Sequence, residues 1–345
     1  MAFQKKEVDH SIQDLKKDLE EGTTKNLYVF CGEETYLRDH YLGELKKAML
    51  TGGLDDFNFH LLTGKDLSIL RIREAVDAMP MMSEHTFVEV VDYDMDRGDK
   101  EAMVDLLSDL PEYVCLVFVY DVMEYKPDAR SKVTKLVREK GSVVNFVRQT
   151  QDDLAKWIAR RFRSMDHEIT AADAQYLIFL CGDLMTGLIS EIEKIGAYAK
   201  EKRITRQDID AVATPQLDAV VFQLTDAIAD GNFDKAFSVM NDLLHMQEAP
   251  IKLLAVLGRQ LRQLYTARLA QEKGKSPQWL MELWGMRSSY PAEKLMRSAR
   301  RFSLDWCRHA LACCEEADLA LKSTGADGRE VLTGLLLELA KGKAA

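Results

Sequence analysis

The sequence predicts an α/β domain at the N-terminal end of the chain, followed by domains that are entirely helical. Two observations carry this prediction. Up to about residue 149, short runs rich in Val, Phe and Leu alternate with helical stretches. After that point no strand-like run occurs, and apolar residues recur at helical spacing. Because helices separate the apolar runs, we expect the strands to be parallel, in a five-stranded sheet covered on both faces.

Each element of the α/β domain has its own signal. The five predicted strands are NLYVFCG (26–32), FNFHLLTG (57–64), TFVEVVDY (86–93), CLVFVYDV (115–122) and SVVNFVR (142–148). Helices are predicted over 33–50 and over 129–141, the second ending at Gly141. A further helix has an apolar stripe of Ile69, Ile72, Val76 and Met79. Pro80 should end that helix at Met79.

Helix start and stop signals organise the second half of the chain. Thr170 is a predicted cap for the helix in 170–182, and another capped helix is predicted over 205–213. Thr214 and Pro215 then predict a cap and a first-turn proline for the next helix. From there to the end the chain reads as helical. We therefore expect three domains: an α/β domain in 1–149, a small helical lid in 150–213 and a helical collar bundle in 214–345.

Composition narrows the function classes. The 345 residues carry a net charge of −10, which argues against broad electrostatic capture of nucleic acid. Basic clusters at 156–163 and 296–302 are interpreted as solvated helix faces. The six cysteines form no C-x-x-C pair, so they are expected to be reduced. With no apolar signal core and no stretch of membrane-spanning length, the chain is expected to be cytoplasmic, without a membrane partner.

An α/β domain followed by a helical lid raises the question of a nucleotide-binding ATPase. The turn after the first strand would have to cradle phosphates in the pattern G-x-x-x-x-G-K-[ST]. It reads CGEETYLRDH instead, with one glycine, Gly32, and no lysine. Glu33 and Glu34 stand where phosphate would bind, and their charge would repel it. Gly274-Lys275-Ser276 lacks the earlier glycine and follows a helix, so it is not a phosphate loop.

Other catalytic patterns are absent from the sequence. The strands that end at Asp92 and Asp121 lack the Asp-Glu pair that would hold magnesium and orient water, and both aspartates are interpreted as turn residues. The seven histidines form no H-E-x-x-H pattern, and there is no G-x-S-x-G turn. We expect no catalytic residue, no metal and no cofactor.

The stretch AMPMMSEH (78–85) places two methionines beyond Pro80, outside the apolar stripe of the preceding helix. Met81 and Met82 are adjacent, so both cannot easily face one core. Two interpretations stay open on the residues alone: the pair packs in a core, or it is an exposed anchor for a partner protein.

Several of these segments together resemble a known family, the delta subunit of the bacterial DNA polymerase III clamp loader. The segments that carry the resemblance are LYVFCGEETYL, AMPMMSEHTFVEV, GDLMTGLISEIEKIGAYA, the run from FQLTDAIADG to LGRQLRQLY, and ADLALKSTGADGREVLTGLLLEL. Each segment by itself is a weak match to the family. Together they span nearly the whole chain, and their order and spacing make the resemblance specific. The resemblance implies an AAA+-like fold of the P-loop type, with a lid and a collar, that neither binds nor hydrolyses ATP.

The resemblance also implies a role for named residues. Family members open the ring-shaped beta sliding clamp by inserting an apolar pair into a pocket of the ring, so that it can be loaded on primed DNA. By position that pair is Met81 and Met82, flanked by Pro80, Ser83 and His85. The family usually has Leu-Phe or Phe-Phe as the pair and a basic residue soon after it, where this chain has His85.

The degenerate nucleotide site would consist of Gly32, Glu33, Glu34 and Met185. Met185 stands where active AAA+ relatives have a nucleotide-sensing arginine. The implied partners are the beta clamp and, through the collar, the gamma/tau and delta-prime subunits, with primer-template DNA contacted indirectly or weakly. The chain would then be part of DNA polymerase III holoenzyme, a DNA-directed DNA polymerase and nucleotidyltransferase, without a catalytic site of its own.

Two alternatives are kept. One is a divergent AAA+ ATPase with an unusual site. The other is a delta-prime-like clamp-loader arm or a helical adaptor, although the Ser-Arg-Cys tripeptide usual in delta-prime subunits does not occur here.

Overall fold

The computed structural model describes residues 11–51, 55–64, 67–245, 248–323 and 325–344. The chain divides into two compact units, Met1–Arg148 and Gln149–Ala345. Each unit has its own core, and each is described by itself.

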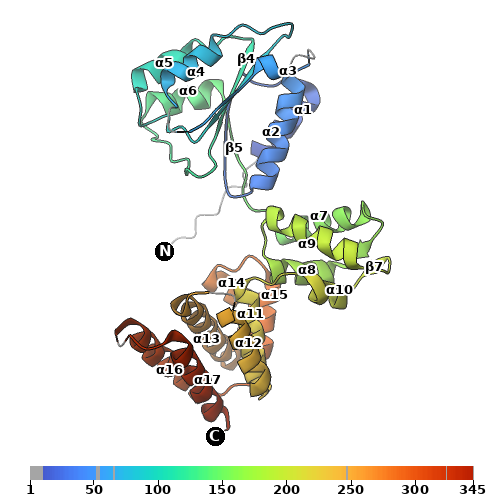
Figure 1. Ribbon diagram of the computed structural model, residues 1–345, viewed down its shortest axis with the longest axis vertical. Helices are drawn as coiled ribbons and strands as arrows, with labels where there is room; N and C mark the ends of the chain where they lie inside the picture. The colour runs from blue at the N-terminus through green and yellow to red at the C-terminus, as the bar shows by residue number, and fades with distance from the viewer. Residues whose placement is uncertain (1–10, 52–54, 65–66, 246–247, 324, 345) are drawn as a thin grey trace. The chain divides into compact units, whose positions relative to one another are not determined.

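The N-terminal unit contains a five-stranded sheet in the order β2-β3-β4-β1-β5, and every neighbouring pair is parallel (Figure 1). Its strands are β1 (Leu27–Cys31), β2 (Phe59–Leu62), β3 (Thr86–Val91), β4 (Val114–Val119) and β5 (Ser142–Asn145). All five predicted strands are therefore present. The central strands β1 and β4 are buried along their whole length, which explains their continuous apolar sequences.

Helices cover both faces of this sheet, as predicted (Figure 1). The helices of the unit are α1 (Ser11–Glu21), α2 (Thr35–Met49), α3 (Asp55–Asn58), α4 (Ile69–Val76), α5 (Lys100–Ser108) and α6 (Lys132–Lys140). Residues of β1 alternate between two cores: Leu27 and Val29 join the core with α4, α5 and α6, whereas Tyr28 and Phe30 join the core with α1 and α2.

The helix before the two methionines ends earlier than predicted. Its last residue is Val76, and Asp77 caps it with an N–H bond to the carbonyl of Arg73. Met79 lies outside the helix with 82% of its surface exposed, so its assignment to the apolar stripe was wrong. The residue before a proline is disfavoured in helical conformation, and the chain leaves the helix before reaching it.

The C-terminal unit begins with four helices and a short pair of strands. These are α7 (Gln151–Arg163), α8 (Ala171–Cys181), α9 (Met185–Tyr198) and α10 (Arg206–Val212), with β6 (Glu168–Ile169) parallel to β7 (Arg203–Ile204). The expectation of no strand after residue 149 was therefore wrong. Two-residue strands are too short to show alternation in sequence, and only the packing of the helices brings them together.

The next helix starts later than its sequence signals indicated. Helix α11 runs from Leu217 to Ala229 with Gln216 at its N-cap, so Thr214 and Pro215 precede the helix instead of opening it. The N–H of Gln216 donates to the carbonyl of Leu180 at 2.8 Å, and the N–H of Thr214 to the carboxylate of Glu191 at 3.0 Å. These bonds hold the segment extended against α8 and α9, a tertiary effect that overrides the local cap signal.

The remaining helices surround one apolar core. They are α11, α12 (Phe233–His245), α13 (Pro250–Glu272), α14 (Pro277–Trp284), α15 (Ser289–Ala299), α16 (Leu304–Ser323) and α17 (Gly328–Ala344). The separation of a lid from a collar within this unit stays a prediction. Among the described residues, no single helix has the length and apolar composition to cross a membrane; α8 and α9 reach them only as a pair bent by 118°.

The first basic cluster lies in α7, and the second spans the end of α15 and the turn that follows it. In α7, Lys156, Arg160 and Arg163 are exposed, and Lys156 faces Asp153 at 3.9 Å. In the second cluster Arg297 and Arg300 are exposed, and Arg301 forms an ion pair with Asp230. These placements agree with solvated helix faces.

Candidate functional site

Two edges of the N-terminal sheet carry the residues that the sequence singles out. Because the strands are parallel, one edge collects the residues that precede them and the other collects the residues that follow them. The loop 77–85 precedes β3 and lies at the amino edge, whereas Gly32, Asp92 and Asp121 follow strands at the carboxyl edge.

At the amino edge, the two methionines are on the surface. Met81 is 54% exposed and Met82 is 81% exposed, so the core-packing interpretation is wrong. Met82 has a φ of 54°, which is unusual for a residue with a side chain. This left-handed residue lies in the bend over 81–84, where the two apolar side chains are exposed.

A buried amide holds this loop in place. Asn58, the last residue of α3, is only 2% exposed. Its Nδ2 donates to the carbonyl oxygen of Met81 at 2.9 Å, and its Oδ1 accepts from the N–H of Met81 at 2.6 Å. The hydroxyl of buried Thr86 donates to the carbonyl of Ala78 at 3.3 Å. Sequence reasoning missed Asn58, because its partner lies 23 positions further along the chain.

The predicted flanking residues have smaller parts in the loop. Pro80 stands directly before Met81, and the hydroxyl of Ser83 accepts from the N–H of His85 at 3.4 Å. The Nδ1 atom of His85 is buried and has no hydrogen-bond partner within the described ranges. His85 is half-buried, and it stands where the resembled family usually has a basic residue.

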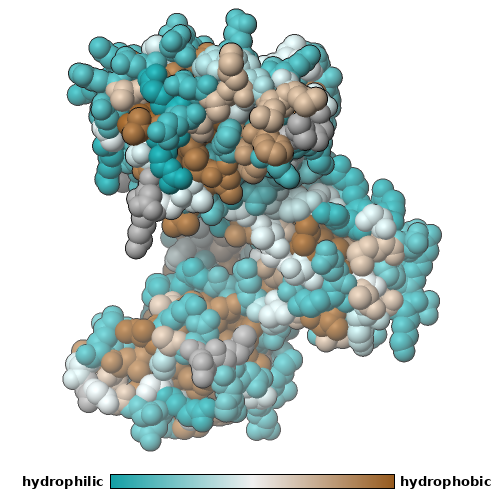
Figure 2. Space-filling model, turned by 45° about the horizontal axis from the view of Figure 1, so that its top comes forward, coloured by the Kyte–Doolittle hydropathy of each residue, from teal (hydrophilic) through white to brown (hydrophobic). Residues whose placement is uncertain are grey.

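Further apolar side chains are exposed close to these methionines in sequence. Six of the fourteen large apolar residues that are exposed in the described chain fall within 57–82, namely Phe57, Leu61, Leu70, Met79, Met81 and Met82. Figure 2 shows apolar side chains, coloured tan to brown, gathered on the N-terminal unit at the top of the view. Such a concentration is typical of a protein-binding surface.

At the carboxyl edge, Gly32 is required by packing. Its φ is 115°, and a Cβ at this position would lie 2.5 Å from the carbonyl oxygen of Phe146. The N–H of Glu34 donates to that same carbonyl at 2.8 Å. The glycine therefore lets the turn approach the segment after β5, which is a structural reason for its presence.

The two glutamates that follow Gly32 have different surroundings. Glu33 is exposed and forms an ion pair with Arg148 at 2.5 Å. Glu34 is fully buried at the N-cap of α2. Both occupy the turn where phosphate would be held, and neither is a cation that could bind it.

A buried arginine, which sequence reasoning missed, lies at the same edge. Arg38 of α2 is 5% exposed and forms ion pairs with Asp121 at 2.7 Å and Asp39 at 2.9 Å. It also donates to the carbonyl of Tyr120 at 3.2 Å. Burial acts to lower the pKa of Arg38, but the bonds to Asp121 and Asp39 outweigh it and raise the pKa. The guanidinium thus joins α2 to the end of β4.

Asp92 is a loop cap. Its carboxylate accepts the N–H groups of Asp121, Val122 and Met123 at 2.9 to 3.2 Å, and its own φ is 54°. Burial acts to raise its pKa, but these three bonds lower it overall. The interpretation of Asp92 as a turn residue agrees with this geometry, since its oxygens are engaged by backbone donors.

The fourth position of the degenerate site lies in the other unit. Met185 is the first residue of α9 and is 2% exposed. It is part of the apolar packing of that unit, where its thioether cannot supply the charge of an arginine. Within the described residues, no group of three or more His, Cys, Asp or Glu side chains could hold a metal ion.

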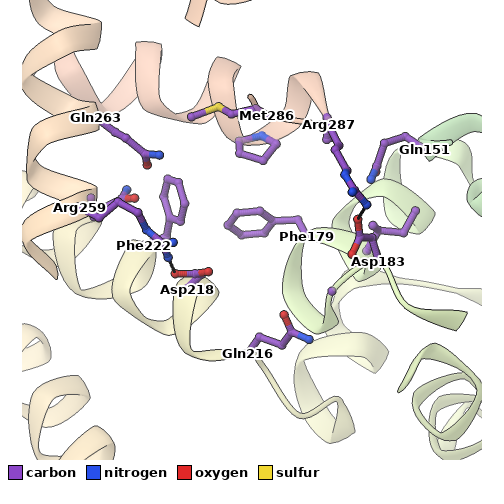
Figure 3. Close-up of a pocket in the computed structure, with 15 residues that line it drawn as sticks. Gln151, Phe179, Asp183, Gln216, Asp218, Phe222, Arg259, Gln263, Met286 and Arg287 are labelled. Atoms are coloured by element: carbon purple, nitrogen blue, oxygen red, sulfur yellow. Dashed lines mark hydrogen bonds and ion pairs between the residues drawn. The ribbon is translucent and has the colours of Figure 1, made fainter. Parts of the chain in front are cut away.

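The C-terminal unit contains a separate hollow of about 320 Å³ (Figure 3). Phe179 and Phe222 form its apolar floor, with ring centroids 5.2 Å apart. Ion pairs lie at its margins, one between Arg259 and Asp218 and one between Arg287 and Asp183. No local pattern in the sequence indicates this hollow, because its lining residues come from five separate segments of the chain.

Two protein-family models match this chain. The family model for the DNA polymerase III delta subunit matches residues 28–147, and the model for the C-terminal domain of that subunit matches residues 218–339. Together these ranges cover more than half of the chain.

Individual relatives agree with this result. The chain is 22% identical over 338 residues to the DNA polymerase III subunit delta of Bacillus subtilis, covering 96% of this chain and 97% of that protein. It is 24% identical over 277 residues to the probable DNA polymerase III subunit delta of Aquifex aeolicus, covering 77% of each.

A solved structure confirms the fold class. The DNA clamp loader delta protein of Bacillus subtilis matches with a TM-score of 0.55 at 20% identity, covering 96% of this chain and 99% of that one. The α/β domain with a five-stranded parallel sheet, followed by a helical part of the chain, is therefore the observed architecture. The chain belongs to the family of DNA polymerase III delta subunits.

Proposed function

We propose that this chain is the clamp-loader arm that binds and opens the beta sliding clamp, with Met81 and Met82 as the residues that enter the clamp. The observation that carries the proposal is the exposure of this adjacent apolar pair at the amino edge of the sheet, on a member of the delta family. Exposed apolar pairs held at a loop are effective anchors for a partner pocket.

The energetics of burial support methionines in this role. Fully burying each side chain in a pocket contributes about 1.5–3 kcal/mol before the cost of ordering is subtracted. Methionine is flexible and polarizable, so it can adapt to a pocket that other family members fill with larger rings. A loop already held by Asn58 and Thr86 lowers the ordering cost.

We further infer that the chain does not bind or hydrolyse ATP. The turn after β1 carries Glu33 and Glu34 in place of a phosphate-binding lysine, and Asp92 is engaged by three backbone N–H groups. Arg38 is bound to Asp121. These contacts leave the carboxyl edge poorly suited to a nucleotide and its magnesium ion.

The partners follow from the family. One solved relative is a DNA clamp loader delta protein, and we propose that this chain assembles with other clamp-loader subunits in the cytoplasm through its C-terminal helical bundle. Gamma/tau and delta-prime subunits are the proposed neighbours. Primer-template DNA would be contacted indirectly or weakly, because the chain has a net charge of −10.

The central experiment measures binding of the full chain to its own beta clamp by isothermal titration calorimetry. The Met81→Ala, Met82→Ala double variant should bind about 100-fold more weakly or worse, by the rule of about 1.4 kcal/mol per tenfold. A matched control exists at the opposite edge, where Val122 and Met123 are also adjacent and exposed. Val122→Ala, Met123→Ala should bind like the wild type. Equal clamp affinity of both double variants would refute the assigned site.

A second experiment tests the absence of nucleotide binding. A fluorescent ATP analogue with Mg²⁺ is titrated against the chain, and an active loader ATPase serves as the positive control. No saturable binding is expected. Saturable binding that Glu33→Ala and Arg38→Ala alter would favour the alternative, a divergent ATPase with an unusual site.

A further inference from the structure

The hydrogen bonds between Asn58 and the backbone of Met81 indicate a functional role for a residue outside the apolar pair. We propose that Asn58 is a positioning residue: its side-chain amide fixes the Met81 peptide so that Met81 and Met82 are presented outside the protein in the conformation that enters the clamp. This inference rests on the proposed function and adds the element that sets the geometry of the site.

The hydrogen bonds define a two-point attachment. One atom of the Asn58 amide accepts from the N–H of Met81 at 2.6 Å, and the other donates to the carbonyl oxygen of Met81 at 2.9 Å. A backbone N–H can only donate and a carbonyl can only accept, so only one orientation of the amide satisfies both bonds. The side chain therefore pairs with the loop as a neighbouring strand would.

Because Asn58 is buried, breaking its two hydrogen bonds to Met81 is energetically costly. Asn58 is 2% exposed, and a buried amide that loses its partners costs much more than one that exchanges them for water. A loop movement that drew Met81 toward the core would break both of these hydrogen bonds to Asn58. The amide thus favours the loop conformation in which the methionines are exposed.

The backbone on either side of Met81 shows why this loop needs stabilising hydrogen bonds from another segment. Pro80 has no N–H to donate. Met82 has a φ of 54°, a left-handed conformation that is unfavourable for a residue with a side chain. Met81 is the residue between them, and both of its backbone polar groups are bound by Asn58. Removing the amide should let Met82 relax toward ordinary backbone angles.

The place of Asn58 in the chain suits this task. It ends α3 and immediately precedes β2, which pairs with β3 at the end of the strand order. The loop 77–85 leads into that same β3. The amide therefore links the amino ends of two paired strands, and Thr86, the first residue of β3, holds the loop a second time through Ala78. The rigid sheet edge sets the position of the methionines.

The binding experiment uses the full chain and its own beta clamp. Asn58→Ala removes both bonds, and the nearly isosteric Asn58→Asp keeps an acceptor for the Met81 N–H but loses the donor. Each should weaken clamp binding about tenfold, mainly through faster dissociation in surface plasmon resonance. The control is Asn26→Ala, which also removes two side-chain bonds to loop carbonyls in this unit, those of Pro111 and Glu112. Asn26→Ala should bind the clamp like the wild type.

Two further measurements separate positioning from a general loss of stability. Amide hydrogen exchange of Met81, followed by NMR in the free chain, should be slow in the wild type and in Asn26→Ala but fast in Asn58→Ala. In the background of Met81→Ala, Met82→Ala, adding Asn58→Ala should cause no further loss of clamp affinity, because the amide acts through the methionines.

The outcomes distinguish this inference from the proposed function. If Asn58→Ala and Asn58→Asp bind the clamp like the wild type while the methionine double variant does not, Asn58 has no positioning role and the proposed site stands. If Asn58→Ala weakens binding equally with and without the methionines, the positioning inference is also wrong. If the wild type does not bind the clamp, or binds it without Met81 and Met82, the proposed function fails and the inference fails with it.

Discussion

The two edges of the N-terminal sheet differ in which side chains are buried or hydrogen-bonded and which are exposed. At the carboxyl edge, Glu34 and Arg38 are buried, and Asp92 is engaged by three backbone N–H groups. At the amino edge, Met81 and Met82 are exposed, and the buried polar residue beside them serves to hold their loop. Arg38 and Asp92 of the carboxyl edge are thus engaged by partners within the fold, whereas the amino edge holds an exposed apolar pair on a loop bonded to Asn58.

This difference shows what each edge is suited to do. A nucleotide site needs backbone N–H groups and cations that are free to bind phosphate. At the carboxyl edge Arg38 is instead ion-paired with Asp121, and the carboxylate of Asp92 takes up three backbone N–H groups. A protein-docking site needs apolar surface held at a fixed position, which the amino edge provides. We therefore expect substitutions at the carboxyl edge to change stability, and substitutions of the methionine pair to leave it unchanged.

The largest loss of stability is expected for Gly32→Ala. The new Cβ would lie 2.5 Å from the Phe146 carbonyl oxygen at a φ of 115°, so the free energy of unfolding should fall by about 3–5 kcal/mol. Urea unfolding followed by circular dichroism measures this. The control is Gly43→Ala inside α2, where a Cβ meets nothing within 4 Å and should stabilise by about 0.5–1 kcal/mol. A tolerated Gly32→Ala would mean that the turn is not closed by packing.

A smaller loss is expected for Arg38→Ala. The variant removes a buried guanidinium that joins α2 to Asp121 and to the Tyr120 carbonyl, and unfolding free energy should fall by about 2–3 kcal/mol. Lys47→Ala in the same helix removes an exposed ion pair with Glu44 and should cost at most about 0.5 kcal/mol. Similar effects of the two substitutions would show that Arg38 is not a structural part of this edge.

Asp92→Asn should have an effect of about 1 kcal/mol that depends on pH. The folded state lowers the pKa of Asp92, so its stabilisation is fully present above the unfolded pKa of about 3.9 and is lost as pH falls through the lower folded value. Asparagine keeps an acceptor and tolerates the φ of 54°. Thermal melts from pH 7 to pH 2.5 should show the gap between wild type and variant closing in acid. A gap that widens in acid contradicts the assigned cause.

The smallest effect on stability is expected for Met81→Ala, Met82→Ala. Both side chains are exposed, so the free energy of unfolding should change by less than about 0.5 kcal/mol. Met103→Ala, at a methionine that is 1% exposed in the core under the sheet, should cost about 2–5 kcal/mol. If the exposed pair destabilised as much as Met103, the distinction between the two edges would be lost.

Local sequence patterns predicted the strands and many helices well, for a physical reason. Strands buried on both faces need continuous apolar residues, and β4 (VCLVFV) shows this over its whole length. Capping is equally local: Thr170 accepts from the N–H of Asp173, and Thr205 forms a capping box with Asp208. The position of Met81 and Met82 after Pro80 placed them outside the apolar stripe of the preceding helix, but it left open whether they are exposed.

Where local signals failed, a distant contact decided the outcome. Thr214 and Pro215 have the sequence of a helix start, but bonds to Leu180 and Glu191 hold this segment extended, and α11 begins at Leu217. The pairing of β6 with β7 joins segments that carry no strand pattern of their own. In each case the decisive partner belongs to another helix or turn of the same unit.

The sequence by itself determined the order of strands and helices along the chain, the absence of a phosphate-binding lysine and the adjacent methionines after a proline, because each depends on neighbouring residues. The tertiary structure alone decided how the two edges are built. Asn58 forms hydrogen bonds with Met81, 23 positions further along the chain, and Arg38 forms one with Tyr120, 82 positions further along. Gly32 is needed because the backbone of Phe146 lies against it. The Asn58 amide and the Arg38 guanidinium gain these partners only when folding brings a distant backbone group within hydrogen-bond distance. No local sequence pattern indicates such a contact.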